Sequence, residues 1–238
     1  MSFFSCPQGW THRLWTDADV DSICLRNQHA YSAAPNYGQK SDILRYELLE
    51  RHGGVYVDVD MECVRPLDDL HGQRGPSFYA GFSNTGTVEL NNGIIGSIPG
   101  HPILRQMIDR INREQSKPVS ARHHPTRAQG SSLATILSFL GRSDAVAAEH
   151  AVARAARELE AFVTIEATGP GLFTRGVAAL VLQQGHVDEV GIVLLAPPVW
   201  FYPIPNRPVA TPSPPAAGAV PAVTYAVHHW ARSWQTRG

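Results

Sequence analysis

The chain has 238 residues, of which 43% are apolar and 17% are charged, and its formal net charge is -1. This composition is typical of one folded globular domain and argues against a disordered chain. There is no basic excess and no interleaving of aromatic and basic residues, so nothing indicates nucleic-acid binding. Any function must therefore be argued from a particular site.

The elements predicted along the chain alternate between helices and strands. An acidic cluster at 17–21 predicts the start of a helix that continues to Tyr31. Ser41 is placed as the N-cap of a second helix, with Asp42 in its first turn, and a Gly-Gly pair at 53–54 ends it. Strands are predicted over 55–60, 78–82, 94–98 and 190–196, and further helices over 102–112, 131–140, 144–160 and 172–184.

This order predicts an α/β fold with a largely parallel sheet flanked by helices, in a single domain over residues 1–238. Residues 207–221 contain five prolines, which predict an extended, mobile surface loop. The aromatic, His-rich segment behind this loop is expected to dock back onto the domain.

The cysteines and the hydropathy of the chain indicate the cellular compartment in which the protein is expected. The three cysteines at positions 6, 24 and 63 form no CxxC pair, which favours reduced thiols over a disulfide framework or a zinc site. The start of the chain has no signal-peptide pattern. The most apolar run, 190–201, is broken by a Pro-Pro pair and is shorter than the roughly twenty residues that span a bilayer. We therefore expect a cytoplasmic protein, soluble or membrane-peripheral, or the product of a longer membrane-tethered precursor.

The strongest chemical signal is the pattern Val55-Tyr56-Val57-Asp58-Val59-Asp60. Residues two apart on a strand point the same way, roughly 6.5–7 Å apart. Asp58 and Asp60 are therefore expected to face one point at the carboxyl end of a buried strand, where open α/β sheets bind ligands. Two like charges on an apolar strand are costly without a counter-charge, and Mn²⁺ or Mg²⁺ completed by phosphate oxygens is the usual solution. The alternative is a strand that ends in two solvated aspartates.

Other segments extend this pattern. Ser41-Asp42-x-x-Arg45-Tyr46 and Gly53-Gly54 precede it, and Asn91-Asn92-Gly93, Pro99-Gly100-His101-Pro102, Thr168-Gly169-Pro170 and His228-His229-Trp230-Ala231-Arg232-Ser233-Trp234 follow it. Together they resemble the glycosyltransferase family with the DXD sugar-binding region. That family includes α-mannosyltransferases, capsular polysaccharide enzymes and, more distantly, glucosylating toxins. The resemblance extends over roughly residues 10–235.

The resemblance implies a Rossmann-like GT-A fold, a Mn²⁺ or Mg²⁺ cofactor, a UDP- or GDP-sugar donor, a saccharide or glycolipid acceptor, and retention of anomeric configuration. Carried over by position, Asp58 contacts the ribose and sugar of the donor, partly through the metal, and Asp60 ligates the metal directly. His228 is a candidate metal ligand or diphosphate contact, with His229 as the alternative histidine. Asp42, Arg45 and Asp58 contact the donor, Asn92 faces the reacting centre, and Ser233 and Trp234 close over the donor phosphates. Each of these residues also has an interpretation without a ligand. Asp42 and Arg45 can form a surface ion pair, Asn92 can belong to a turn, and the aromatic segment at 228–234 can simply pack against the domain.

The chain departs from the family at its start. Relatives usually open with a strand of the type Ile-Pro-Lys-Ile-Ile-His, whereas this chain begins after it, at the segment that matches residues 10–19. No base-binding residue is therefore assigned. The leading hypothesis is a metal-dependent retaining glycosyltransferase, and the alternative is a catalytically impaired nucleotide- or carbohydrate-binding remnant. A phosphohydrolase is a third hypothesis, although Met61-Glu62 after the second aspartate does not suit that chemistry.

Overall fold

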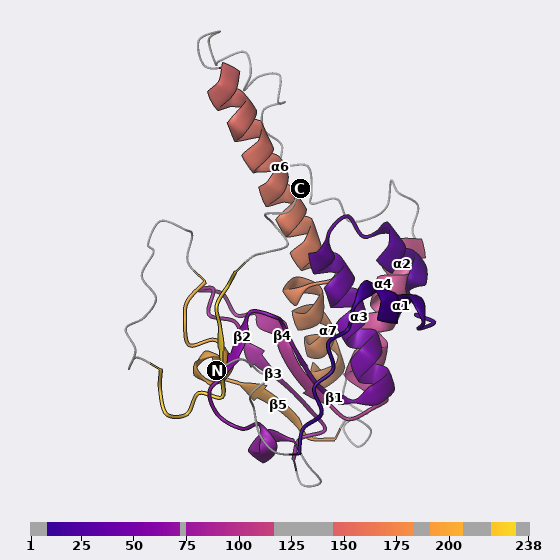
Figure 1. Cartoon of the computed structure of the whole chain (residues 1–238), viewed down its shortest axis with the longest axis vertical. Helices are drawn as coiled ribbons and strands as arrows, with labels where there is room; N and C mark the ends of the chain where they lie inside the picture. The colour runs from indigo at the N-terminus through magenta and orange to yellow at the C-terminus, as the bar shows by residue number, and fades with distance from the viewer. Residues whose placement is uncertain (1–8, 72–74, 117–144, 183–190, 207–219, 232–238) are drawn as a thin grey trace.

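The computed structural model describes residues 9–71, 75–116, 145–182, 191–206 and 220–231. Its centre is a four-stranded sheet with several helices packed on one face, while the chain from the second half of the sequence returns across the other (Figure 1). One long helix, α6, extends away from the body of the molecule (Figure 1). The predicted helix at 131–140 and all but the last two residues of the predicted loop at 207–221 lie outside the described residues.

The helices are α1 (Asp17–Asp21), α2 (Gln28–Ala33), α3 (Tyr37–His52), α4 (Pro102–Ser116), α6 (Ala145–Ala167), α7 (Pro170–Leu182) and α9 (Pro198–Phe201), with a 3-10 turn, η2 (Asp68–Leu70). The strands are β1 (Gly54–Val57), β2 (Met61–Cys63), β3 (Phe78–Phe82), β4 (Leu90–Ser97), β5 (Val193–Ala196) and β6 (Ala226–His228). Within the described residues, no helix combines the length and the apolar character needed to cross a membrane.

The main sheet is mixed, with strand order β1-β4-β3-β5. Strand β4 pairs antiparallel with both β1 and β3, and β3 pairs parallel with β5. The α/β class is confirmed, but the prediction of a largely parallel sheet is wrong. Parallel strands need a crossover of about a dozen residues or more, and the short segment 83–89 between β3 and β4 permits only a hairpin.

Alternation along the strands divides the core between the two faces of the sheet. Phe78 and Ala80 of β3 pack with the apolar residues of α3, α4 and α7, whereas Tyr79 packs with β2, α9 and β6. Strand β4 is buried along its whole length between these two clusters. Because β4 also pairs with a strand on either side, it holds the residues that follow β1 in a fixed position.

Two predicted boundaries near the site are wrong. The strand predicted over 55–60 ends at Val57, and Val59 is 85% exposed. Strand β1 is half-buried and pairs on one side only among the described strands, so it is an edge strand rather than a buried one. Asp58 and Asp60 therefore lie in the turn between β1 and β2. Their backbone follows the turn, which the alternation of valines does not reveal.

The helix that carries Asp42 begins earlier than predicted. Its N-cap is Asn36, whose side-chain oxygen accepts a hydrogen bond from the backbone N–H of Gln39 at 2.9 Å. Ser41 and Asp42 consequently lie inside α3 and not at its start. The helix predicted to reach Tyr31 is also divided, into α1 and α2.

The cysteines differ from the prediction as well. Cys63 in β2 is disulfide-bonded, and Cys24 is a free, exposed thiol. Spacing along the chain does not reveal which cysteines the fold brings together. Since disulfides persist mainly in oxidising compartments, the cysteine argument for a cytoplasmic location does not hold.

Candidate active site

Backbone hydrogen bonds fix the turn that carries the two aspartates. The N–H of Asp58 donates to the carbonyl of Gly93 on β4 at 2.8 Å, which continues the β1–β4 ladder by one residue. The N–H of Met61 then donates to the carbonyl of Asp58 at 3.1 Å and closes the turn. A Cβ on Gly93 would lie only 2.8 Å from Oδ2 of Asp58, so the absent side chain gives this carboxylate its space.

Strand β6 brings the C-terminal part of the chain to this turn. It pairs antiparallel with β2, and His228 lies opposite Met61. The backbone N–H of His229 donates to the carbonyl of Asp60 at 3.0 Å, and the N–H of Ala231 donates to Oδ2 of Asp60 at 2.8 Å. These bonds hold the segment after β6 against Asp60, so His228 is placed by two-stranded pairing and not by a loop.

The side chains of Asp58, Asp60 and His228 converge. Nε2 of His228 lies 3.1 Å from Oδ1 of Asp60 and 3.8 Å from Oδ2 of Asp58. One ligand atom from each residue can be chosen so that all three lie within 4.8 Å of one another. Burial would raise the pKa of Asp60, but hydrogen bonds from His228 and from the N–H of Ala231 lower it overall, which keeps the carboxylate ionised. Two carboxylates and an imidazole are a donor set that suits a divalent cation such as Mn²⁺.

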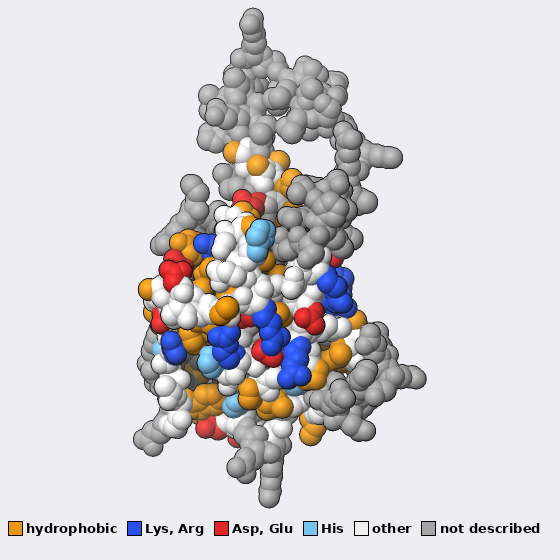
Figure 2. Space-filling view, turned by 90° about the vertical axis from the view of Figure 1, so that its right-hand side faces the viewer, with side chains coloured by type: hydrophobic (Ala, Val, Ile, Leu, Met, Phe, Trp, Pro, Cys, Tyr) orange, Lys and Arg blue, Asp and Glu red, His pale blue; other side chains and the backbone are white. Residues whose placement is uncertain are grey.

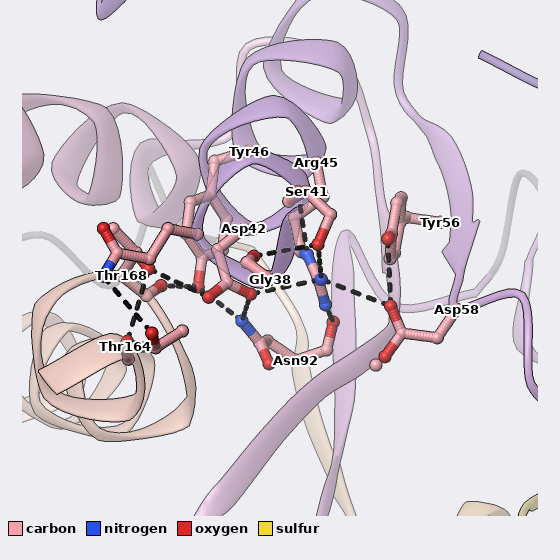
Figure 3. A network of polar contacts seen from close by, with 12 residues as sticks. Gly38, Ser41, Asp42, Arg45, Tyr46, Tyr56, Asp58, Asn92, Thr164 and Thr168 are labelled. Atoms are coloured by element: carbon pink, nitrogen blue, oxygen red, sulfur yellow. Dashed lines mark hydrogen bonds and ion pairs between the residues drawn. The ribbon is translucent and has the colours of Figure 1, made fainter. Parts of the chain in front are cut away.

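A second cluster lies beside the first and centres on Arg45 (Figure 3). Nη2 of Arg45 lies 3.1 Å from Oδ1 of Asp42 and 3.2 Å from Oδ1 of Asp58, and the guanidinium packs on the ring of Tyr56. Its Nη1 donates to the carbonyl of Asn92. The hydroxyl of Tyr56 donates to the same oxygen of Asp58 at 2.9 Å. Arg45 and Tyr56 therefore hold Oδ1 of Asp58, while Oδ2 faces His228.

Asp42 is buried and is held from three sides (Figure 3). Besides Arg45, the amide of Asn92 donates to its Oδ1 at 2.8 Å and the hydroxyl of Thr168 donates to its Oδ2 at 2.9 Å. Burial raises the pKa of Asp42 to about 6, against the opposing effects of Arg45 and Thr168. A carboxylate offers about four acceptor positions, so this one can accept one further hydrogen bond at Oδ2.

Two cavities meet at these clusters. The smaller, of about 340 Å³, is lined by residues of both clusters, and the larger, of about 530 Å³, runs beside β1 and α3. The larger cavity has an aromatic and apolar lining that includes Trp10, Trp15 and Leu48. The residues that line both cavities are Tyr37, Ser41, Tyr56, Asp58 and Val59. The Asp58 turn is thus the point at which the two cavities join.

Most of the predicted site residues lie together. The smaller cavity is lined by Asp42, Arg45, Asp58, Asp60, Asn92 and His228. His229 points elsewhere, with Nε2 3.1 Å from Glu62 on the opposite face of the β2–β6 pair, and half of its side chain is exposed. Ser233 and Trp234 lie outside the described residues.

Three residues of the site carried little or no signal in the sequence. Tyr56 belongs to the pattern at 55–60, but that pattern assigned it no contact, and its hydroxyl donates to Asp58 across the end of the strand. Thr168 was noted only as part of a family motif, because its bond to Asp42 joins residues 126 positions apart. Glu89 lines the smaller cavity, and no motif singled it out.

Part of the chain is similar in sequence to known glycosyltransferases. Residues 6–75 match the family model described as the glycosyltransferase sugar-binding region containing the DXD motif. Inositol phosphoceramide mannosyltransferase 1 of Schizosaccharomyces pombe is 31% identical over 109 residues, which cover 44% of this chain and 33% of that protein. An uncharacterized glycosyltransferase of Acanthamoeba polyphaga mimivirus is 43% identical over 101 residues, 40% of each chain.

Among solved structures, the UDP-bound glycosyltransferase domain of the YGT toxin aligns over 67% of this chain and 45% of that domain, with 16% identity and a TM-score of 0.38. The sequence similarity to the DXD glycosyltransferase family thus covers residues 6–75 for the family model and about 100 residues for each of these two relatives. The chain spans two fifths or less of the length of the two curated relatives named above.

Proposed function

We propose that the chain is a metal-dependent, retaining glycosyltransferase of GT-A type that transfers a sugar from a UDP- or GDP-sugar to a saccharide or glycolipid acceptor. The observation that carries the proposal is the convergence of Asp58, Asp60 and His228 at the junction of two cavities. The match of residues 6–75 to the DXD region supports the same reaction class.

The charge balance of the site supports a divalent cation. Asp42, Asp58, Asp60 and Glu89 bring four carboxylates to one cavity, and Arg45 is the one guanidinium among its described lining residues. Oδ2 of Asp58 and Oδ1 of Asp60 converge with the imidazole of His228. Mn²⁺ or Mg²⁺ bound there would supply positive charge to a diphosphate leaving group. Asp58, Asp60 and His228 would hold it.

The two joined cavities support the placement of the donor. The apolar and aromatic lining of the larger cavity suits a nucleoside, since small-molecule pockets are mostly apolar with few polar groups. The sugar then lies in the smaller cavity, where Asp42 has one acceptor position left and Asn92 and Arg45 fix its orientation. In this arrangement the diphosphate, which links the nucleoside to the sugar, would lie beside the turn that carries Asp58, where the two cavities join.

The proposed reaction exchanges one bond at the anomeric carbon for another. The acceptor oxygen bonds to that carbon as its bond to the diphosphate breaks, and the acceptor proton goes to the leaving phosphate. Asp42 and Asp58 are assigned to the donor and the metal in this proposal, so neither is given the role of a covalent nucleophile. Retention without a protein nucleophile is compatible with substitution on one face of the sugar.

The proposal is tested by donor turnover. The purified chain is incubated with UDP-glucose, UDP-galactose, UDP-N-acetylglucosamine or GDP-mannose, with and without Mn²⁺, and the released nucleotide is measured. We expect metal-dependent release from at least one donor, lowered about 100-fold or more in Asp60→Asn.

Asp69→Asn is the matched control, because Asp69 is a largely exposed aspartate paired with Arg65 away from the cavity. Nucleotide binding without turnover of any donor would favour the binding-remnant hypothesis. Turnover that is equal with and without metal, or equal in Asp60→Asn, would contradict the proposed role of this site.

A further inference from the structure

Glu89 is a carboxylate in the smaller cavity that the roles above leave unused. It lies at the end of the 83–89 segment, directly before β4. Its carbonyl accepts a hydrogen bond from the N–H of Ser83 at 2.7 Å, and the N–H of the next residue, Leu90, donates to the hydroxyl of Thr174 on α7 at 2.9 Å. Backbone bonds on both sides therefore fix the position from which its side chain lines the cavity.

The other carboxylates of this cavity all have partners. Asp42 and Asp58 share Arg45, and Asp60 is bonded to His228 and Ala231. The side chain of Glu89, by contrast, makes no hydrogen bond and no ion pair with any described residue, although it is half-buried. Burial raises its pKa, and the charge of Glu166 raises it further. A partly buried carboxylate without a partner costs free energy, which a ligand that donates a hydrogen bond would recover.

The surroundings of Glu89 indicate which ligand that is. The described lining of the cavity contains four carboxylates, one guanidinium and no lysine. Thr85, Asn91 and Asn206, which line the cavity as well, are neutral and can both donate and accept hydrogen bonds. A group that reaches Glu89 must therefore donate hydrogen bonds, and a negative charge there would be repelled.

We propose that Glu89 is the acceptor-binding residue of this site, and that its carboxylate accepts a hydrogen bond from a hydroxyl of a neutral polyhydroxyl acceptor and disfavours anionic ones. The inference rests on the proposed glycosyl transfer. It goes further by assigning the acceptor side of the cavity and the charge class of the acceptor. The metal and donor groups keep the partners described above, so a change at Glu89 should leave both in place.

The test uses matched acceptors and the whole chain. Transfer is measured from the donor that the chain turns over to the methyl glycosides of glucose, galactose and mannose, and to the corresponding uronic acids, which differ only in a carboxylate at C6. We expect transfer to at least one neutral glycoside. In Glu89→Ala its KM should rise about tenfold or more, since one charge-assisted hydrogen bond is lost. The donor KM and the rate of donor hydrolysis in water should stay within about twofold of the parent.

Glu89→Gln keeps the size of the side chain and removes its charge, so it separates charge from packing. We expect this variant to lose most of the preference for the neutral glycoside over the matching uronic acid. Glu158→Gln, an exposed glutamate paired with Arg154 on α6, is the control and should keep the parent's preference. A charge preference that Glu89→Gln leaves unchanged would overturn the proposal, because packing alone could then explain the Ala variant.

Three other outcomes would also count against it. A parallel rise of the donor KM in Glu89→Ala would place Glu89 on the donor. Hydrolysis of donor by the parent without transfer to any neutral glycoside would refute the acceptor class. Absence of any metal-dependent donor turnover in the parent would instead contradict the proposed function itself, and the inference would fall with it.

Discussion

Arg45 is the residue on which the charge balance of the site depends. Burial alone would lower the pKa of Arg45, but the carboxylates of Asp58 and Asp42 raise it, so the guanidinium stays charged. It also stacks on Tyr56 and donates to the carbonyl of Asn92. One cation thus orients two carboxylates from different elements, α3 and the β1–β2 turn. Lysine could not replace it, because a single ammonium group lacks the planar fork of donors.

The first prediction concerns Asp42 and pH. Its pKa is raised from the ordinary value of 3.8 to about 6, so the folded state holds this proton more tightly than the unfolded state does. The stability that Asp42 contributes is full below pH 3.8 and is lost as the pH rises through about 6, by about 3 kcal/mol in all. Urea unfolding at intervals between pH 4 and pH 7 measures this loss.

Asp42→Asn removes the titrating group, so the comparison with the parent isolates it. The difference in the free energy of unfolding between parent and variant should change across this pH range, with the variant gaining relative stability as the pH rises. A difference that stays constant from pH 4 to pH 7 would show that the pKa of Asp42 is not raised in the folded protein.

The sequence patterns predicted which residues belong to the site, but they did not predict the contacts that those residues make. Asp42, Arg45, Asp58, Asp60 and His228 were selected from the sequence, and the structure places all of them around one cavity. Their assigned roles remain proposals. The contacts of Thr168 with Asp42 and of β6 with β2 join distant parts of the chain, and no local pattern records such pairings.

Strand β4 is the element that positions both clusters. It is buried throughout, pairs with β1 and β3, and carries Asn92 toward Asp42 and Gly93 beside Asp58. Close packing against β3 depends on Gly96, since a Cβ there would lie 2.0 Å from the ring of Tyr79. The glycine is therefore a packing requirement of this strand pair.

Gly96→Ala is predicted to lower the free energy of unfolding by about 1–3 kcal/mol, because the methyl group overlaps the ring of Tyr79 in a filled core. Urea denaturation of the variant measures the loss. A double-mutant cycle with Tyr79→Leu identifies the cause, since removal of the ring should relieve part of the penalty. If the two losses simply add, the overlap with Tyr79 is not the reason.

The sequence predicted the bounds of some helices and strands correctly, but it did not predict how the strands pair. The strand predicted over 78–82 has the bounds of β3, and the helix predicted from Pro102 begins there. The parallel sheet was wrong because the alternation of strands and helices was extended to a pair joined by the short segment 83–89. The N-cap of α3 was misplaced because Asn36 and Ser41 are both good capping residues.

The whole molecule places the candidate site where the first and last parts of the described chain meet. Helix α3 and the β1–β2 turn come from the N-terminal part, and β6 returns from the C-terminal part to pair with β2. Figure 2 shows basic and acidic side chains near one another on the described part of one face of the molecule, and the formal net charge of the whole chain is -1. The proposed recognition of the donor rests on the two joined cavities.

The central claim is that Asp58, Asp60 and His228 form one metal site that holds the donor's diphosphate. Calorimetric titration with UDP and with GDP, with and without Mn²⁺, tests it most directly, using His228→Gln and Asp60→Asn against His229→Gln as the neighbouring control. The account predicts metal-dependent binding of one nucleotide, weakened about 10–100-fold or more in the first two variants and unchanged in the third. Binding that needs no metal, or that is lost equally in His228→Gln and His229→Gln, would contradict it.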